Sequence, residues 1–294
     1  MSSVGISEEE AALLSSNLEK LNKLLIKRKD LILDTKFRKE ITEYIQDFLY
    51  VINIKKKKLT DGYLYRIRII KEDETRFENL SDLLIPPKDK SEQGRMNNNN
   101  LRVLYASYAQ NIAELECGIN KLKVGEKFQV TKFKISEPIR YYYLGMIAEI
   151  IFNLPFKSEK QKEAMEELGS KNFDLNYPFF KKIALTESYL AEALYAKNNN
   201  NYILSSLISE IIFDYLKDEI DAFVYPSQRN NNGMNIAIKE TALKKITPDI
   251  TFENKVVENY YEKHVKYHTL SFAYLSWSTE KIEYKKEETK SCYW

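Results

Sequence analysis

Arginine, glutamate and serine side chains in three short segments could together bind an anionic ligand and act on its sugar. The first segment is Leu64–Arg66, the second runs from Tyr105 to Glu116, and the third is Tyr225–Ser227. An arginine fork binds phosphate oxygens through paired donors, and a carboxylate stabilises positive charge that develops on a ribose. The combination suits a negatively charged ligand that carries a ribose, and no other stretch of the chain offers comparable chemistry.

A fourth segment, which lies between the first two, adds a second arginine in a turn-rich stretch. Pro86-Pro87 is followed by Gly94-Arg95-Met96-Asn97, and an asparagine run continues to Asn100. Proline, glycine and asparagine favour turns, and asparagine can adopt backbone angles that otherwise require glycine. We therefore expect Arg95 to lie in a loop, where it could bind a ligand or be solvated. We interpret the asparagine run as loop filler.

The elements that must carry these side chains are strands and helices in no strict alternation. Strands are predicted at 63–70, 101–108, 126–135, 221–225 and 234–239, and helices at 109–120, at 202–217 and over most of 141–200 outside a loop at 172–178. Residues 63–70 alternate in polarity, so Leu64, Arg66 and Arg68 share one face of their strand. Strands and helices mixed without a βα repeat indicate an α+β fold.

The two ends of the chain are predicted to lie outside the central domain. Residues 7–53 carry apolar residues at helical spacing, which predicts a helical hairpin whose apolar stripe docks on the domain or on another copy. The charge run Lys55–Lys58 would join the hairpin to the domain as a solvated hinge. The expected division is a helical extension over 1–57, a ligand-binding domain over 58–249 and a C-terminal extension over 250–294 with a helix and a strand.

The order of these segments resembles the RES-domain family, which is named for its arginine, glutamate and serine and includes bacterial toxins that destroy or use NAD. The resemblance rests on Leu-Tyr-Arg, Pro-Pro followed by Gly-Arg-x-Asn, Leu-Tyr with a glutamate eleven residues after the tyrosine, and Tyr-Pro-Ser. It covers roughly residues 60–240. Family members usually have a glycine soon after Gly-Arg-x-Asn, whereas this chain has Asn98-Asn99-Asn100-Leu101 there.

The resemblance implies a fold like that of the ADP-ribosyltransferases, with a mixed sheet core, surrounding helices and the N-terminal hairpin as an addition. It implies that the domain over 58–249 is catalytic, takes NAD as its substrate and cleaves the nicotinamide–ribose bond without a metal. Matched position by position, the catalytic residues would be Glu116, Arg66 and Ser227, and the NAD-binding residues would be Arg66, Arg95, Tyr105 and Ser227. Glu114 is a rival for the glutamate, but the eleven-residue step from Tyr105 selects Glu116.

Each role fits its residue type. Breaking the nicotinamide–ribose bond creates an oxocarbenium-like sugar, which the Glu116 carboxylate would stabilise. Arg66 and Arg95 would bind the pyrophosphate through a planar fork that lysine lacks, and Tyr105 would stack on the nicotinamide or hold its carboxamide. The alternatives are structural. Arg66 could pair with a carboxylate, Tyr105 could pack in the core, and Glu116 could be a surface residue. Ser227 could simply form a turn.

Several functions stay open on the sequence. The acceptor of the ADP-ribosyl group could be phosphate, water, or a protein or nucleic-acid target. The activity would accordingly be that of an NAD phosphorylase, a glycohydrolase or an ADP-ribosyltransferase, and the family resemblance favours the small acceptors. Because such an activity is toxic, the resemblance also implies an antitoxin as a protein partner. A different class of function is a non-catalytic interaction module that acts through the hairpin. The oligomeric state is open, a homo-oligomer included.

Composition and missing motifs exclude other classes. The chain has 294 residues with 45 basic and 43 acidic side chains, so it lacks the basic excess of nucleic-acid binders. No apolar run approaches the ~18–20 residues that cross a bilayer, and residues 1–10 are too polar for a signal peptide, so we expect a cytoplasmic protein. Cys117 and Cys292 are too few for a disulfide scaffold. His264 and His268 lack further metal ligands, and no Walker or Gly-x-Gly-x-x-Gly loop is present.

Overall fold

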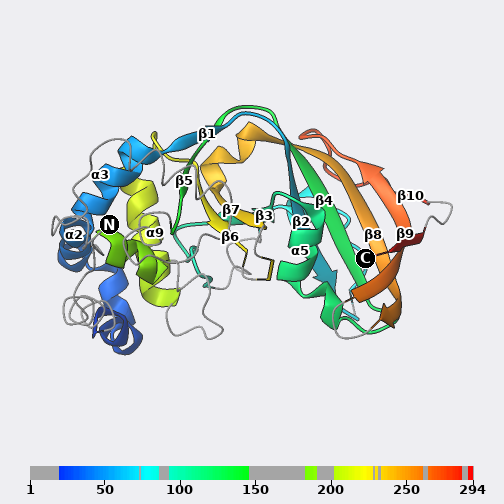
Figure 1. Ribbon diagram of the computed structural model, residues 1–294, viewed down its shortest axis with the longest axis horizontal. Coiled ribbons are helices and arrows are strands. Elements are labelled where there is room, and N and C mark those ends of the chain that lie inside the picture. The colour runs from blue at the N-terminus through cyan, green and yellow to red at the C-terminus, as the bar shows by residue number, and fades with distance from the viewer. Residues whose placement is uncertain are drawn as a thin grey trace, which may run out of the picture. The chain divides into compact units, whose positions relative to one another are not determined.

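The computed structural model describes nine stretches of the chain. They are residues 20–72, 74–85, 93–145, 183–190, 202–227, 229–230, 233–260, 264–286 and 291–293. Helices and strands are intermixed, which confirms the predicted α+β class (Figure 1). The fold divides into two compact units, each built from several segments. Unit 1 contains Met1–Lys57, Ser91–Val103 and Arg140–Tyr225, and unit 2 contains Lys58–Lys90, Leu104–Ile139 and Pro226–Trp294.

Unit 1 combines helices with a parallel pair of strands. Its elements are the 3-10 helix η1 (Lys29–Leu33), the helices α2 (Thr35–Tyr44), α3 (Gln46–Lys55) and α9 (Tyr202–Tyr215), and the strands β5 (Ile139–Tyr143) and β6 (Ala222–Pro226). Residues 20–27 and 183–190 are also helical. β5 and β6 run parallel, with Tyr142 beside Phe223. β6 ends at Pro226, and the predicted serine, Ser227, follows it in the chain.

The N-terminal helices belong to the core of unit 1. The side chain of Asp34 accepts a hydrogen bond from the backbone N–H of Phe37 at 2.7 Å, which caps α2 and separates it from η1. Helix α3 buries Phe48 almost completely. Arg38 of α2 forms an ion pair with Glu210 of α9 at 3.0 Å. The sequence places these residues in a separate extension, whereas the described helices pack within unit 1 as integral parts of it.

Unit 2 contains a sheet in which every strand pair with a defined register is antiparallel. The strand order is β7 (Met234–Lys239), β3 (Val103–Ser107), β2 (Tyr63–Ile70), β4 (Lys127–Ile135), β8 (Ile246–Tyr260), β9 (His264–Tyr274) and β10 (Lys285–Lys286), with β11 (Ser291–Tyr293) also paired to β9. The helices are α4 (Leu80–Leu83), α5 (Gln110–Cys117), and the 3-10 segments η3 (Ile119–Lys121) and η5 (Glu240–Lys245). A further short strand, β1 (Lys57–Leu59), joins the two units in sequence.

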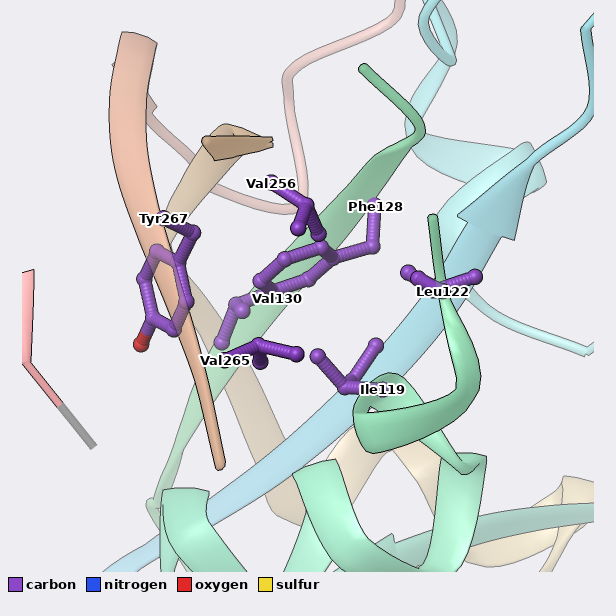
Figure 2. Packing of buried hydrophobic residues seen from close by; sticks show 7 residues of the cluster. All are labelled: Ile119, Leu122, Phe128, Val130, Val256, Val265 and Tyr267. Carbon is purple, nitrogen blue, oxygen red and sulfur yellow. The ribbon is translucent and has the colours of Figure 1, made fainter. Parts of the chain in front are cut away.

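One apolar cluster packs the end of helix α5 against the sheet of unit 2, because Cys117 of α5 and the segment just after the helix contact it. Figure 2 shows its buried side chains, which come from β4, β8, β9 and the segment just after α5: Ile119, Leu122, Phe128, Val130, Val256, Val265 and Tyr267. The rings of Phe128 and Tyr267 meet edge to face, with centroids 4.9 Å apart. Such close packing makes an interior resist displacement, so the cluster gives α5 a defined place on the sheet.

The C-terminal segment departs from the prediction of an appended helix and strand. β8 pairs along the length of β4, from Ile135↔Ile246 to Lys127↔Lys255, and then along β9. Both segments after 250 are therefore strands of the sheet, and no helix is found there in the described residues. Charged residues on the outer face made the alternating pattern of these strands hard to recognise in the sequence. On the inner face, Val256, Val265 and Tyr267 point into the core.

Some sequence predictions fall on residues that the structure does not describe. These are Pro86-Pro87, the first part of the N-terminal helix up to residue 19, the loop at 172–178 and most of 141–200.

Candidate functional site

Glu116 and Ser227, two of the predicted site residues, are in direct contact within unit 2. The hydroxyl of Ser227 donates a hydrogen bond to Oε1 of Glu116 at 2.5 Å. The side-chain amide of Asn235 donates a second bond to the same oxygen at 3.0 Å. Oε2 of Glu116 accepts no hydrogen bond from the residues that the structure describes. One carboxylate oxygen is thus held in place while the other is available to a ligand.

Helix α5 ends one residue after Glu116, so the carboxylate lies at the negative end of the helix dipole. Gly118 has a φ of +77°, the left-handed conformation that commonly terminates helices and that glycine adopts without strain. The carbonyl groups at a helix C-terminus disfavour a nearby negative charge. The hydrogen bonds from Ser227 and Asn235 offset that unfavourable field, and Glu116 itself is half-buried.

Ser227 is held by its own loop as well as by Glu116. Its backbone N–H donates to the carbonyl oxygen of Gly233 at 2.7 Å, and its hydroxyl accepts from the backbone N–H of Arg229 at 3.1 Å. The serine is 1% exposed. Ser227 therefore has two roles in the structure. It closes the loop, as the turn alternative predicted, and it contacts Glu116.

Gly233 allows this loop to lie against α5, and we expect alanine there to disturb both. A Cβ atom at Gly233 would lie 2.6 Å from Cδ1 of Ile112, a buried residue of α5. Overpacking of this kind costs roughly 1–3 kcal/mol of stability. Gly233→Ala should therefore unfold at lower denaturant than the parent. Ile112→Val removes Cδ1, so the double variant should be more stable than the two single effects added together. Simple additivity in a denaturant titration would contradict the close approach.

Glu114, the rival carboxylate, lies on the other side of α5 and has a structural role. Residues two apart on a helix do not face each other, so Glu114 and Glu116 point in different directions. Glu114 is 6% exposed, and its Oε1 accepts hydrogen bonds from the Tyr267 hydroxyl at 2.8 Å and from the Gln110 amide at 2.9 Å. These bonds fasten α5 to β9. Burial raises the pKa of the Glu114 carboxyl above its ordinary value.

The raised pKa of Glu114 predicts a pH-dependent effect of its replacement. The folded protein holds this proton more tightly than the unfolded chain, so the associated stability is complete below about pH 4.3 and is lost as the pH rises through the folded-state pKa. Glutamine stays neutral and can accept the same bonds. The melting temperature of Glu114→Gln minus that of the parent should therefore increase between pH 4 and pH 8. A difference between the two proteins that is constant across this range would refute the assignment.

Arg66 lies where strands β2 and β3 diverge. In these two fully described strands the register pairs Tyr65 with Ser107 alone, and the Nη1 of Arg66 donates to the carbonyl oxygen of Tyr105 at 3.0 Å. Its Nε is buried without a hydrogen-bond partner, and it forms no ion pair with the described residues. Burial, aided by the nearby Arg68, lowers the pKa of Arg66 to about 10, so the guanidinium keeps its charge at neutral pH. No carboxylate among the described residues forms an ion pair with Arg66, so the structural alternative that the sequence left open has no support there.

The strand alternation places Tyr105 on the face of Ser107 and starts Arg66 on the opposite face, although the charge of Arg66 still interacts with Cys117, the neighbour of Glu116. Directly paired residues of antiparallel strands share a face, so Tyr65 lies on the face of Ser107, and Arg66 starts on the opposite one. Tyr105 is two residues from Ser107 and therefore shares its face. The tyrosine is half-buried. The structure thus brings Glu116 and Ser227 together, places Tyr105 on the same side of the sheet, and joins Arg66 to the backbone of Tyr105.

Arg95 lies in unit 1, in the predicted loop, where it contacts helix α9. Its Nε donates to the hydroxyl of Tyr202 at 3.1 Å, and its carbonyl oxygen accepts from the hydroxyl of Ser205 at 2.7 Å. The asparagine run does more than fill this loop. The side-chain oxygen of Asn98 accepts from the backbone of Leu101 at 2.9 Å, and its amide donates to buried Glu210 at 2.7 Å. Asn98 thus forms the turn at Leu101 and also fastens the loop to helix α9.

Sequence reasoning did not identify Asn235 or Ser107. The hydroxyl of Ser107 donates to the side-chain oxygen of Asn235 at 2.6 Å, and both residues are buried. A signal was present, because Asn235 is the single polar residue within the apolar run from Met234 to Ile238. A polar residue in a buried strand needs hydrogen-bond partners, and such a need is a reason to look for a polar site.

Two other expectations concern metal and membrane. No group of three or more metal-binding side chains occurs among the described residues. His264 and His268 lie four residues apart on strand β9, where that step spans roughly 13 Å. No helix within the described stretches is long and apolar enough to cross a membrane.

Comparison with known proteins gives a single distant likeness to report. No family model matches the chain, and no curated protein matches it. Among solved structures, the chain is similar to a chain of the M. tuberculosis MbcT–MbcA toxin–antitoxin complex, with a TM-score of 0.37 and 7% sequence identity. The alignment covers 70% of this chain and 91% of that chain.

Proposed function

We propose that this protein is an enzyme that cleaves the nicotinamide–ribose bond of NAD, with Glu116 as the residue that stabilises the ribose cation. The observation that carries the proposal is the Glu116 carboxylate. Ser227 and Asn235 donate to its Oε1 at 2.5 and 3.0 Å, and its Oε2 accepts no bond from the described residues. A carboxylate that is held by one oxygen and open at the other is suited to a cationic or hydroxyl-bearing partner.

The chemistry requires little beyond a well-placed negative charge. When the glycosidic C–N bond breaks, its electron pair leaves with nicotinamide, and positive charge spreads over the anomeric carbon and the ring oxygen of the ribose. The Glu116 carboxylate would stabilise that charge, and Oε2 could also accept a hydrogen bond from a ribose hydroxyl. An acceptor then bonds to the anomeric carbon and loses its proton. A side chain that is already held in its reactive position loses little entropy in the transition state, so the fixed rotamer of Glu116 favours catalysis.

Arg66 supports the binding of an anion. Arg66 is half-buried as a residue, its Nε is buried, and its charge has no carboxylate partner among the described residues, so a phosphate group would stabilise it. Arg66 is proposed to bind the pyrophosphate, and Tyr105 is proposed to contact the nicotinamide. The pyrophosphate-binding role of Arg95, which lies in unit 1, stays a prediction from the motif. Ser227 is proposed to act through Glu116. An ADP-ribosyltransferase-like core and membership of the RES-domain family rest on the motifs and belong to the same proposal.

The same motifs support a toxin that is neutralised by an antitoxin protein. Uncontrolled NAD cleavage would deplete a cell, and the resemblance to the RES-domain family therefore implies a neutralising partner. Expression of the protein alone should arrest growth, and Glu116→Gln should relieve the arrest. Growth that stops equally with both forms would argue against an enzymatic cause.

The direct test is to incubate the purified protein with NAD and to measure nicotinamide and the ADP-ribosyl product. Release that depends on added phosphate, with an ADP-ribose phosphate product, indicates phosphorolysis, and release that yields ADP-ribose indicates hydrolysis. Release that needs added protein or nucleic acid, with label retained on that polymer, indicates transfer to a macromolecule. No release under any of these conditions would overturn the proposal and favour a non-catalytic interaction module.

A further inference from the structure

We infer that Asn235 is a positioning residue for Glu116 and that Ser107 holds the Asn235 side chain in place. The inference rests on the proposed function, because the rate of NAD cleavage is its main readout. It adds two residues outside the arginine, glutamate and serine pattern. Both lie on strands of unit 2, Ser107 at the end of β3 and Asn235 near the start of β7.

Hydrogen bonds from Ser107 to Glu116 form an ordered chain of donors. The Ser107 hydroxyl donates to Oδ1 of Asn235 at 2.6 Å, and Nδ2 of Asn235 donates to Oε1 of Glu116 at 3.0 Å. An asparagine amide can turn over, which exchanges its donor and its acceptor. The Glu116 carboxylate can only accept, so it selects the amide nitrogen, and the Ser107 hydroxyl holds this orientation by donating to Oδ1. The amide nitrogen is consequently directed at the carboxylate.

Burial makes this arrangement specific. Ser107 is 3% exposed and Asn235 is 4% exposed, so water cannot easily replace either partner. A polar group buried in this way is costly to leave unpaired. The Asn235 amide therefore restricts the Glu116 side chain to conformations in which Oε1 meets both Asn235 and Ser227. The remaining oxygen, Oε2, is then presented in one direction.

Position in the helix explains why Glu116 needs this support. It sits in the last turn of α5, where the helix C-terminus opposes its negative charge. A glutamate there would otherwise sample several rotamers, since its side chain has three rotatable bonds. Ser227 alone provides one donor from a loop, whereas Asn235 provides a donor from a strand of the sheet. Two donors from different elements define the carboxylate more closely than either one.

A purely structural role for Asn235 makes different predictions from a positioning role. If Asn235 merely satisfies buried polar groups, its loss should reduce stability and leave the turnover of the folded fraction unchanged. If it positions Glu116, its loss should lower kcat while the KM for NAD changes little, since binding groups elsewhere are intact. Ser107 would act only through Asn235, so its replacement should have no further effect once Asn235 is gone.

The experiment compares the full-length parent with Ser107→Ala, Asn235→Ala and the double variant. Steady-state nicotinamide release gives kcat and KM, and thermal unfolding monitors the fold. We expect kcat to fall roughly 10- to 100-fold in Asn235→Ala, by about threefold or more in Ser107→Ala, and in the double variant to the level of Asn235→Ala. Asn235→Asp keeps the shape but places a carboxylate against Glu116, so it should be at least as impaired as Asn235→Ala.

Three outcomes would overturn the inference. The first is an active parent whose kcat is unchanged in Ser107→Ala and Asn235→Ala, which would leave the proposed function standing. The second is a pair of effects that multiply in the double variant, since Ser107 would then act independently of Asn235. The third is a parent that releases no nicotinamide, which would overturn the proposed function and this assignment together. If Asn235→Ala fails to fold, the kcat of Ser107→Ala decides the question.

Discussion

Replacing Glu116 with glutamine should lower NAD cleavage by roughly 10²-fold or more, because the variant loses the negative charge that faces the ribose cation. Glutamine keeps the size of the side chain, and its oxygen can still accept hydrogen bonds from Ser227 and Asn235. The fold and the position of the side chain are therefore retained while the charge is removed. Nicotinamide release under single-turnover conditions measures the effect on the chemical step itself.

Glu114→Gln provides a matched control for this experiment. It makes the same chemical change two residues earlier in the same helix, at a carboxyl that is buried against Tyr267 and Gln110. We expect its cleavage rate to stay within about twofold of the parent, since Glu114 does not contact the proposed site. Equal NAD consumption by Glu116→Gln and the parent would show that Glu116 does not stabilise the ribose cation. A loss of activity in Glu114→Gln instead would mean that the wrong carboxylate was chosen.

Replacing Phe48 with alanine should destabilise unit 1 by roughly 3–5 kcal/mol, the usual cost of removing a buried phenylalanine. Phe48 is 1% exposed, and its ring meets that of Tyr142 edge to face with centroids 5.7 Å apart. The loss combines the transfer energy of the ring with the cavity left beside Tyr142. Chemical denaturation followed by circular dichroism measures the change. An effect of this size requires that α3 belongs to the core of its unit.

Tyr50→Ala is the control, because Tyr50 lies in the same helix and is 63% exposed. Its replacement should change the free energy of unfolding by no more than about 0.5 kcal/mol. If Phe48→Ala were as mild as Tyr50→Ala, the N-terminal helices would be the detachable extension that their sequence suggests. A large difference between the two variants would support the packing described for unit 1.

Local patterns predicted the elements around the site well. The strand over Tyr63–Ile70 and the strand over Met234–Lys239 lie where the alternation places them, and the helix that carries Glu116 begins and ends within a few residues of its expected bounds. The prediction was wrong after residue 250, where charged side chains on one face hid the strand alternation of β8 and β9. A charged outer face is compatible with a strand or a helix, so only the partner strand decided between them.

The sequence by itself determined which side chains could perform the proposed chemistry and which local element carries each of them. Periodicity places Arg66 and Tyr105 on strands and Glu116 on a helix, because backbone geometry repeats over a few residues. The motif spacing selected Glu116 over Glu114, but only the tertiary structure decided that Glu116 contacts Ser227, a residue 111 positions away in the chain. It also brought in Ser107 and Asn235, which no motif marks. Contacts of that range depend on how the sheet is ordered and how α5 packs on it, and neither is encoded in any short stretch of residues.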